Sequence, residues 1–271
     1  MQDIELTSFT KTVSESRSVL ILIPGNPDLD AVAAALSLSL SLKSGGKEVT
    51  VACPTPMIVE FNRLVGVNKV TDKLGDKNLA ISLEDYKADA IEKVSYDIEG
   101  DKFTLVVVPK PGMLSPKREQ VRIDFAGVSA DLVIIVKAEN KESLGKFADN
   151  GEIWDPSRKI VLLGNFPAQG FERALEMIDP QASCASEAAF KVIEGTGLPL
   201  DEDTATNLFL GLHSGTNHFQ SQSVAAKTFE VASRLVSLGA RTKQEFRPVE
   251  AQKQTPPDWL GPKVFKGSTL P

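Results

Sequence analysis

The chain alternates between short, continuous apolar runs and longer amphipathic segments. Residues 4–16 carry apolar side chains at helical spacing, which predicts an amphipathic helix. SVLILI at 18–23 is a continuous apolar run rich in β-branched residues, a pattern typical of a strand buried on both faces of a parallel sheet. The start of the chain therefore predicts a helix followed by an interior strand.

A second helix and a second strand are expected next. Asn26 is a favourable N-cap and Pro27 suits the first helical position, so we expect a helix from Pro27 to about Lys43. The glycines at 45–46 end this helix, and the strand pattern KEVTVAC follows at 47–53. A strand–helix–strand unit of this kind almost always forms a right-handed parallel pair.

The rest of the chain keeps this alternation and adds a hairpin. VSYDI at 94–98 and FTLVVV at 103–108 flank a turn that contains Gly100, and QVRIDF at 120–125 is a candidate partner strand. The order of elements predicts an α/β fold, with a mostly parallel sheet flanked by helices and a β-hairpin insertion. Further strands are expected at 131–136 and 159–164, and further helices at 184–194, 202–212 and 221–240.

Composition narrows the class of protein. The chain has 271 residues, with 42% apolar and 24% charged residues, as in globular proteins. Its net charge of −6 gives no general attraction to nucleic acid or anionic membranes. The longest apolar-rich stretch, 31–42, is too short to cross a bilayer. The polar start is unlike a secretory signal, and two cysteines are too few for a disulfide framework or a thiolate zinc site. We therefore expect a cytoplasmic protein.

Two carboxylates mark the first candidate site. Ligands of open α/β sheets bind beyond the carboxyl ends of the strands, and Asp28 and Asp30 follow the first strand there. Such a pair can hold a hard cation such as manganese or magnesium. Acidic residues in a first helical turn also complement the helix dipole, for about 0.3–1 kcal/mol each. Spacing alone favours the dipole explanation.

Several separated segments, over roughly residues 4–240, resemble the motifs of DHH phosphoesterases. That family has the N-terminal catalytic fold expected here for residues 1–245, and its members are two-metal phosphodiesterases or phosphatases that commonly use manganese. The segments that resemble its motifs, in order, are NPDLDA at 26–31, DLVIIVK at 131–137, KIVLLGNF at 159–166, IDPQASCASEAAFKVIEG at 178–195 and ATNLFLGLHSGTNHF at 205–219.

Most metal-ligand positions implied by the resemblance carry other residues. Asp28 and Asp30 are kept, but Pro24 replaces a His, and Lys137 and Gly215 each replace an Asp. The resemblance therefore implies a former active-site cleft in which no metal site is expected, with Asp28 and Asp30 as weak candidates. Its residues are Pro24, Asn26, Asp28, Asp30, Lys137, Gly215, and Gly164, Asn165 and Phe166 in place of Asp-His-His.

These departures predict a non-catalytic binding or scaffolding protein with no cofactor, which retains at most a residual nucleotide or phosphate pocket. The alternative is a divergent phosphodiesterase for short oligonucleotides or cyclic dinucleotides, with manganese held by Asp28 and Asp30. Under the first interpretation two like charges repel at close range, so either another group offsets them or one carboxylate is protonated. Lys137 follows the neighbouring strand, so we expect it to form an ion pair with Asp28 or Asp30.

Other residues near the motifs carry weaker signals. Ser183 and Ser186 resemble family positions near bound phosphate, and the start of their helix offers backbone amides to an anion. His213 and His218 are five residues apart and do not share a helix face, so a structural role is favoured over a ligand role. Cys184 is favoured as a small buried residue over a reactive thiol.

The C-terminal segment 246–271 is expected to be an extended tail outside the domain. It carries Trp259 and Phe265 among prolines, which suits docking on its own domain or on a protein partner. We expect no membrane and no nucleic acid among the partners, and a homodimer is compatible with the sequence.

Overall fold

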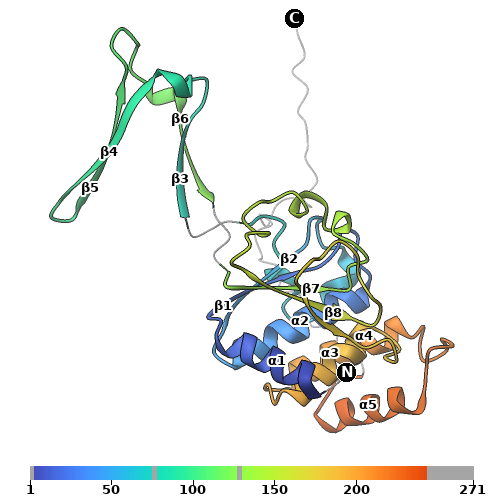
Figure 1. Cartoon of the computed structure of the whole chain (residues 1–271). Coiled ribbons are helices and arrows are strands. Elements are labelled where there is room, and N and C mark those ends of the chain that lie inside the picture. The colour runs from blue at the N-terminus through green and yellow to red at the C-terminus, as the bar shows by residue number, and fades with distance from the viewer. Residues whose placement is uncertain (1–2, 75–77, 127–129, 243–271) are drawn as a thin grey trace, which may run out of the picture.

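A computed structural model describes residues 3–74, 78–126 and 130–242. Its body contains a five-stranded, all-parallel sheet in the order β2-β1-β7-β8-β9, which confirms the expected fold class (Figure 1). The strand β9 has only four residues and was not predicted. The strands are β1 (Ser18–Leu22), β2 (Glu48–Ala52), β7 (Leu132–Val136), β8 (Lys159–Gly164) and β9 (Leu175–Ile178).

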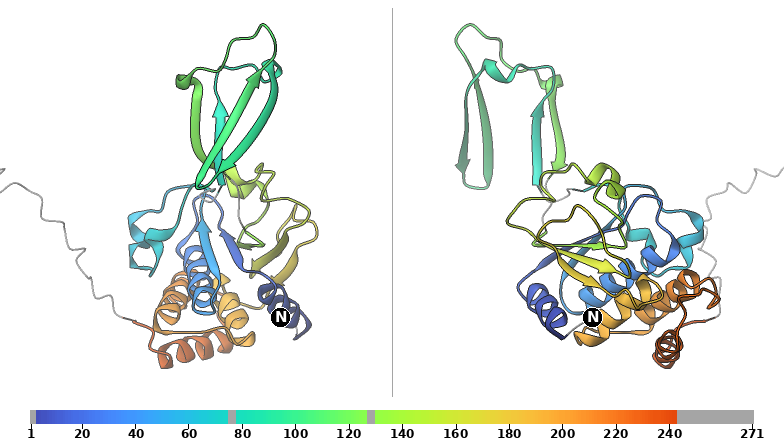
Figure 2. Two further views of the ribbon diagram at one scale, coloured as in Figure 1. Left: turned by 90° about the vertical axis from the view of Figure 1, so that its left-hand side faces the viewer. Right: turned by 45° about the vertical axis from the view of Figure 1, so that its right-hand side comes forward.

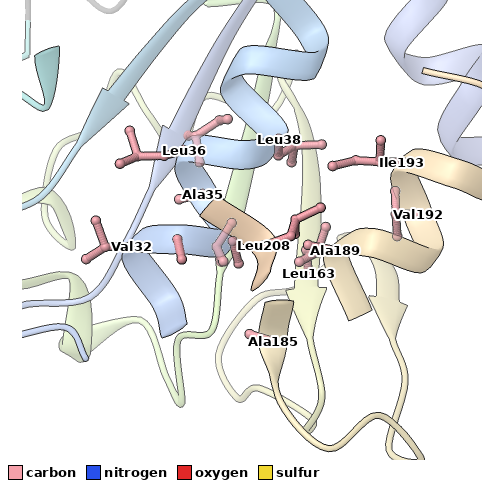
Figure 3. Close-up of a cluster of buried hydrophobic side chains, with 14 of the residues drawn as sticks. Val32, Ala35, Leu36, Leu38, Leu163, Ala185, Ala189, Val192, Ile193 and Leu208 are labelled. Carbon is pink, nitrogen blue, oxygen red and sulfur yellow. The ribbon is translucent and has the colours of Figure 1, made fainter. Parts of the chain in front are cut away.

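Helices cover one face of this sheet, and loops cover the other (Figure 1). Alternate residues of β1 enter two cores: Ile21 packs on the helical side, and Leu20 and Leu22 pack with residues of the loops that follow β7. Figure 3 shows the helical side, where side chains from three helices meet the sheet. The helices are α1 (Asp3–Ser14), α2 (Leu29–Ser44), α3 (Ala185–Gly195), α4 (Glu202–Gly215) and α5 (Ala226–Ser237).

The start of α2 differs from the prediction. Asp28, not Asn26, is the N-cap, and its Oδ1 accepts a hydrogen bond of 2.9 Å from the Ala31 amide. Asn26 lies two residues earlier with φ of +51°, in the left-handed region, so it belongs to the loop. The reason is that both residue types are good caps, and the path of the chain after β1 decides which of them meets the free amides.

An insertion of two antiparallel ribbons projects from the body (Figure 2). The hairpin of β4 (Ile91–Glu99) and β5 (Lys102–Pro109) is as predicted, with Gly100 in its turn at φ of +58°. The prediction that residues 120–125 pair with this hairpin was wrong. They form β6 (Val121–Ala126), which pairs with the unpredicted strand β3 (Asn78–Leu83). We call these two ribbons the arm.

The helix predicted at 221–240 is shorter than expected, because α5 begins only at Ala226 after a series of turns. The expected tail at 246–271, with Trp259 and Phe265, lies outside the described residues. Within the described ranges, no helix is long and apolar enough to cross a membrane. Short 3-10 helices lie at Val59–Arg63, Val67–Lys69, Ala88–Ala90, Arg118–Gln120 and Glu142–Phe147.

Candidate functional site

The candidate site lies at the carboxyl edge of the parallel sheet, where three neighbouring strands end. The strand β1 leads into the loop before Asp28, β7 leads into Lys137, and β8 leads into Asn165. β7 pairs with both β1 and β8, so these three strand ends are adjacent. This is the place at which open α/β sheets bind their ligands.

An ion pair occupies this edge. The Lys137 Nζ lies 2.7 Å from Asp28 Oδ2 and 2.7 Å from Asp30 Oδ2. The predicted pairing of Lys137 is confirmed, and the ammonium contacts both carboxylates instead of one. Burial of the ammonium acts to lower its pKa, but the charges and hydrogen bonds of Asp30 and Asp28 outweigh it and hold the pKa above its usual value.

Asp30 is the buried member of this group. Its side chain is 1% exposed, against 17% for Lys137 and 58% for Asp28. Besides the lysine, the Asp30 carboxylate accepts hydrogen bonds from the backbone amides of Ala185 (2.9 Å) and Ser186 (2.8 Å), at the start of α3. A helix N-terminus is an anion site, and here it binds a carboxylate of the chain itself.

The backbone at this edge is strained. Lys137 has φ of +53°, and lysine has no short polar side chain that favours this left-handed conformation. Its amide donates a 2.9 Å hydrogen bond to the Leu163 carbonyl, which fixes the chain as it leaves β7. Such strain costs on the order of 1–3 kcal/mol and persists only where surrounding contacts determine the conformation. The double ion pair is one contact of that kind.

Gly215 packs directly against the same carboxylate. A Cβ added at this glycine would lie 2.8 Å from Asp30 Cγ and 2.7 Å from Cys184 Cβ. The position at which the family resemblance implies an Asp therefore has no room for a side chain. Cys184 is buried, and its pKa is raised by burial and by the charge of Asp30, so the expectation of an inert, buried cysteine agrees with its environment.

The other predicted cleft residues, from Pro24 and from the end of β8, have different surroundings. A Cβ added at Gly164 would lie 3.7 Å from Lys137 Cα, so this glycine is adjacent to the backbone of Lys137. Asn165 and Phe166 follow it and are half-buried, and the Asn165 Oδ1 is buried without a hydrogen-bond partner among the described residues. Pro24 contributes its carbonyl to a weak 3.5 Å hydrogen bond from Cys53 Sγ.

The hydroxyl groups of Ser183 and Ser186 form hydrogen bonds with other groups of the protein. The Ser183 hydroxyl donates a 2.5 Å hydrogen bond to the buried Glu187, and the Ser186 hydroxyl donates a 3.3 Å bond to the Asp30 carbonyl. Phosphate binding by these serines stays a prediction, and a phosphate would have to displace Asp30 from the amides of α3.

The two histidines lie side by side, although their spacing suggested otherwise. Their ring centroids are 4.5 Å apart in an edge-to-face arrangement. Three consecutive residues, 217–219, have φ between +47° and +63°, and this left-handed turn after α4 returns His218 to His213. Burial lowers the pKa of His213, and the nearby His218 and Arg63 lower it further. The spacing of the two histidines in the sequence gives no indication of this turn.

The residues at this edge do not fit a two-metal centre. In the described parts of the chain, no three His, Cys, Asp or Glu side chains gather in a group that could hold a metal ion. Pro24, Gly164, Phe166 and Gly215 offer no side-chain donor atom, and an ammonium lies between the two carboxylates that remain. A recess of about 550 Å³ lies elsewhere, and none of the predicted site residues lines it; its lining residues are Leu6, Asp179, Pro180, Gln181, Lys191 and Lys227.

Two solved structures resemble this one to different degrees. An exopolyphosphatase-related protein from Bacteroides fragilis superposes with a TM-score of 0.63 at 16% identity, over 89% of this chain and 58% of that chain. A putative family II inorganic pyrophosphatase from Methanococcus jannaschii gives a TM-score of 0.44 at 12% identity, over 83% of this chain and 57% of that one. The first similarity shows a common fold.

Similarity at the level of sequence is also found. The uncharacterized protein MG371 homolog of Mycoplasma pneumoniae is 26% identical over 121 residues, which are 45% of this chain and 36% of that protein. No protein-family model matches the chain. The chain spans less than two thirds of the length of each of these proteins.

Proposed function

We propose that this chain is a non-catalytic binding or scaffolding protein built on a DHH-like phosphoesterase fold. The fold shared with the exopolyphosphatase-related protein supports the DHH-like part of the proposal. The observation that carries the non-catalytic part is the contact of Lys137 with Asp28 and Asp30, because a fixed ammonium there supplies the positive charge that a metal ion would otherwise supply.

The chemistry of the donor set supports this proposal. A two-metal hydrolase needs a bridging carboxylate, enough anionic or imidazole ligands for two ions, and an open position for water. Here Asp30 is buried under one ammonium and two backbone amides, which leaves it little capacity to bridge two ions. The start of α3 is engaged by the same carboxylate, which favours the scaffolding role over a residual phosphate pocket.

Direct binding of manganese is the decisive test. Isothermal titration of the full chain with MnCl₂ is expected to give no saturable heat, and Asp28→Asn is expected to behave identically. Assays of a short oligonucleotide and a cyclic dinucleotide with manganese are expected to show no turnover. Manganese-dependent hydrolysis that disappears in Asp28→Asn would overturn the proposal in favour of a divergent phosphodiesterase.

A further inference from the structure

The β4–β5 hairpin of the arm carries a continuous apolar surface on one face. Its strand register places Val94 opposite Val107, Tyr96 opposite Leu105 and Ile98 opposite Phe103. Because side chains of a strand alternate between faces, all six project from the same face. We call these six residues the apolar stripe. The opposite face is mixed and includes Lys93, Asp97, Glu99 and Lys102.

Five of the six side chains of the apolar stripe are exposed, and Val107 is half-buried. Tyr96 is 70% exposed, Ile98 63% and Phe103 62%, and the stacked rings of Tyr96 and Phe103 lie 6.0 Å apart. The second ribbon of the arm repeats this pattern, because Ile81 lies opposite Ile123 with both side chains exposed and with exposed Leu79 two residues away. A single two-stranded ribbon is only marginally stable in water, so the apolar face of each ribbon needs another surface to pack against.

We propose that a second copy of this chain covers the apolar stripe, through packing of the two hairpins face to face about a two-fold axis. A contact of this type brings the same patch of both copies together, so the patch must be neutral or self-complementary in charge. The stripe contains no charged residue, which satisfies this requirement along its whole length. Two sheet faces packed in this way form a core about 10 Å thick.

The available area reaches the minimum of a specific interface. From the exposure of its residues, the stripe offers roughly 500 Å² per copy, or about 1,000 Å² for a pair, which is the lower bound of a specific interface. Figure 2 shows the arm projecting away from the body.

The test measures the mass of the full chain in solution and uses a matched pair of substitutions. Analytical ultracentrifugation over a wide concentration range is expected to show a reversible dimer of the 29.2 kDa chain. Tyr96→Lys places a charge on the stripe and is expected to weaken the dimer by about tenfold or more. Ser95→Lys places the same charge one residue away on the opposite face and is expected to leave the dimer intact.

Hydrogen exchange of the unmodified chain tests the proposal without any variant. Amides of residues 91–109 are expected to exchange more slowly as the concentration rises. A single-chain mass at all concentrations would overturn the proposal, and so would a dimer that survives Tyr96→Lys or that dissociates equally with Ser95→Lys. Protection of 91–109 that does not depend on concentration and disappears when residues 243–271 are deleted would overturn it in favour of the C-terminal tail.

Discussion

The ammonium of Lys137 lies 2.7 Å from the carboxylate of Asp30, a residue 107 positions earlier in the sequence that is buried at the start of α2. The lysine follows β7 and the aspartate follows β1, and these two strands are neighbours in the sheet. The contact therefore joins the central strands at the edge where ligands of such folds bind. Its energetic consequences can be measured.

Lys137→Ala is expected to destabilise the protein by about 3 kcal/mol, because removal of one partner leaves the buried Asp30 carboxylate without its cation. Lys146→Ala is the matched control, since Lys146 pairs with Asp72 at a site where both side chains are about half exposed, and the expected loss is below about 1 kcal/mol. Urea unfolding of both variants measures the difference. Equal losses would show that the Lys137 pair contributes no more than a surface ion pair.

Lys137→Asp is expected to be less stable than Lys137→Ala in the absence of metal, because it adds a third carboxylate beside two others. Like charges about 4 Å apart repel by roughly 4 kcal/mol at an effective dielectric of 20. Manganese should then raise the melting temperature of Lys137→Asp but not that of the unmodified chain. Thermal unfolding with and without MnCl₂ tests this. An equal rise of the melting temperature in both proteins would contradict the idea that the Lys137 ammonium takes the place of a metal ion.

Gly215→Ala is expected to cost about 1–3 kcal/mol, because its Cβ would lie closer than 3 Å to atoms of both Asp30 and Cys184. Gly151→Ala is the control, since a Cβ at Gly151 meets nothing within 4 Å. Differential scanning calorimetry of the pair measures the effect. A neutral Gly215→Ala would mean that the packing around Asp30 relaxes easily.

Glu187→Gln is expected to destabilise the protein by about 2 kcal/mol at neutral pH. The buried Glu187 carboxylate accepts hydrogen bonds from Ser183 and Thr228 and pairs with Lys191 at 3.0 Å. Burial acts to raise its pKa, but the bonds from Ser183 and the charge of Lys191 hold the pKa below its usual value.

The pH dependence of this effect follows from the sign of the pKa shift. A lowered pKa in the folded state means that the stabilisation is present above the unfolded pKa of 4.5 and is lost as the pH falls through the folded value. The difference between Glu187→Gln and the unmodified chain should therefore shrink below about pH 4.5. Glu194→Gln on the same helix, paired with the exposed Arg234, should have little effect at any pH in urea titrations.

The sequence alone determined the main elements of the body. The apolar run at 18–23, the glycines at 45–46 and the run at 131–136 set the interior strands and the end of α2, because a strand buried on both faces needs continuous apolar residues. The order of these elements also determined that Lys137 and Asp28 share one edge of the sheet. The carboxyl ends of parallel strands lie at the same edge of the sheet, so this placement can be predicted without knowing any side-chain contact.

Only the tertiary structure decided the contacts across distant segments. The pairing of β6 with β3, instead of with the hairpin, joins strands that the whole β4–β5 hairpin separates in the chain, and local pattern does not encode such a pairing. The meeting of Asp30 with the amides of α3 depends on how two helices, 155 positions apart in the chain, pack on the same sheet. Local sequence sets which residues favour a strand or a cap, and the packing of the whole chain decides which partner each of them meets.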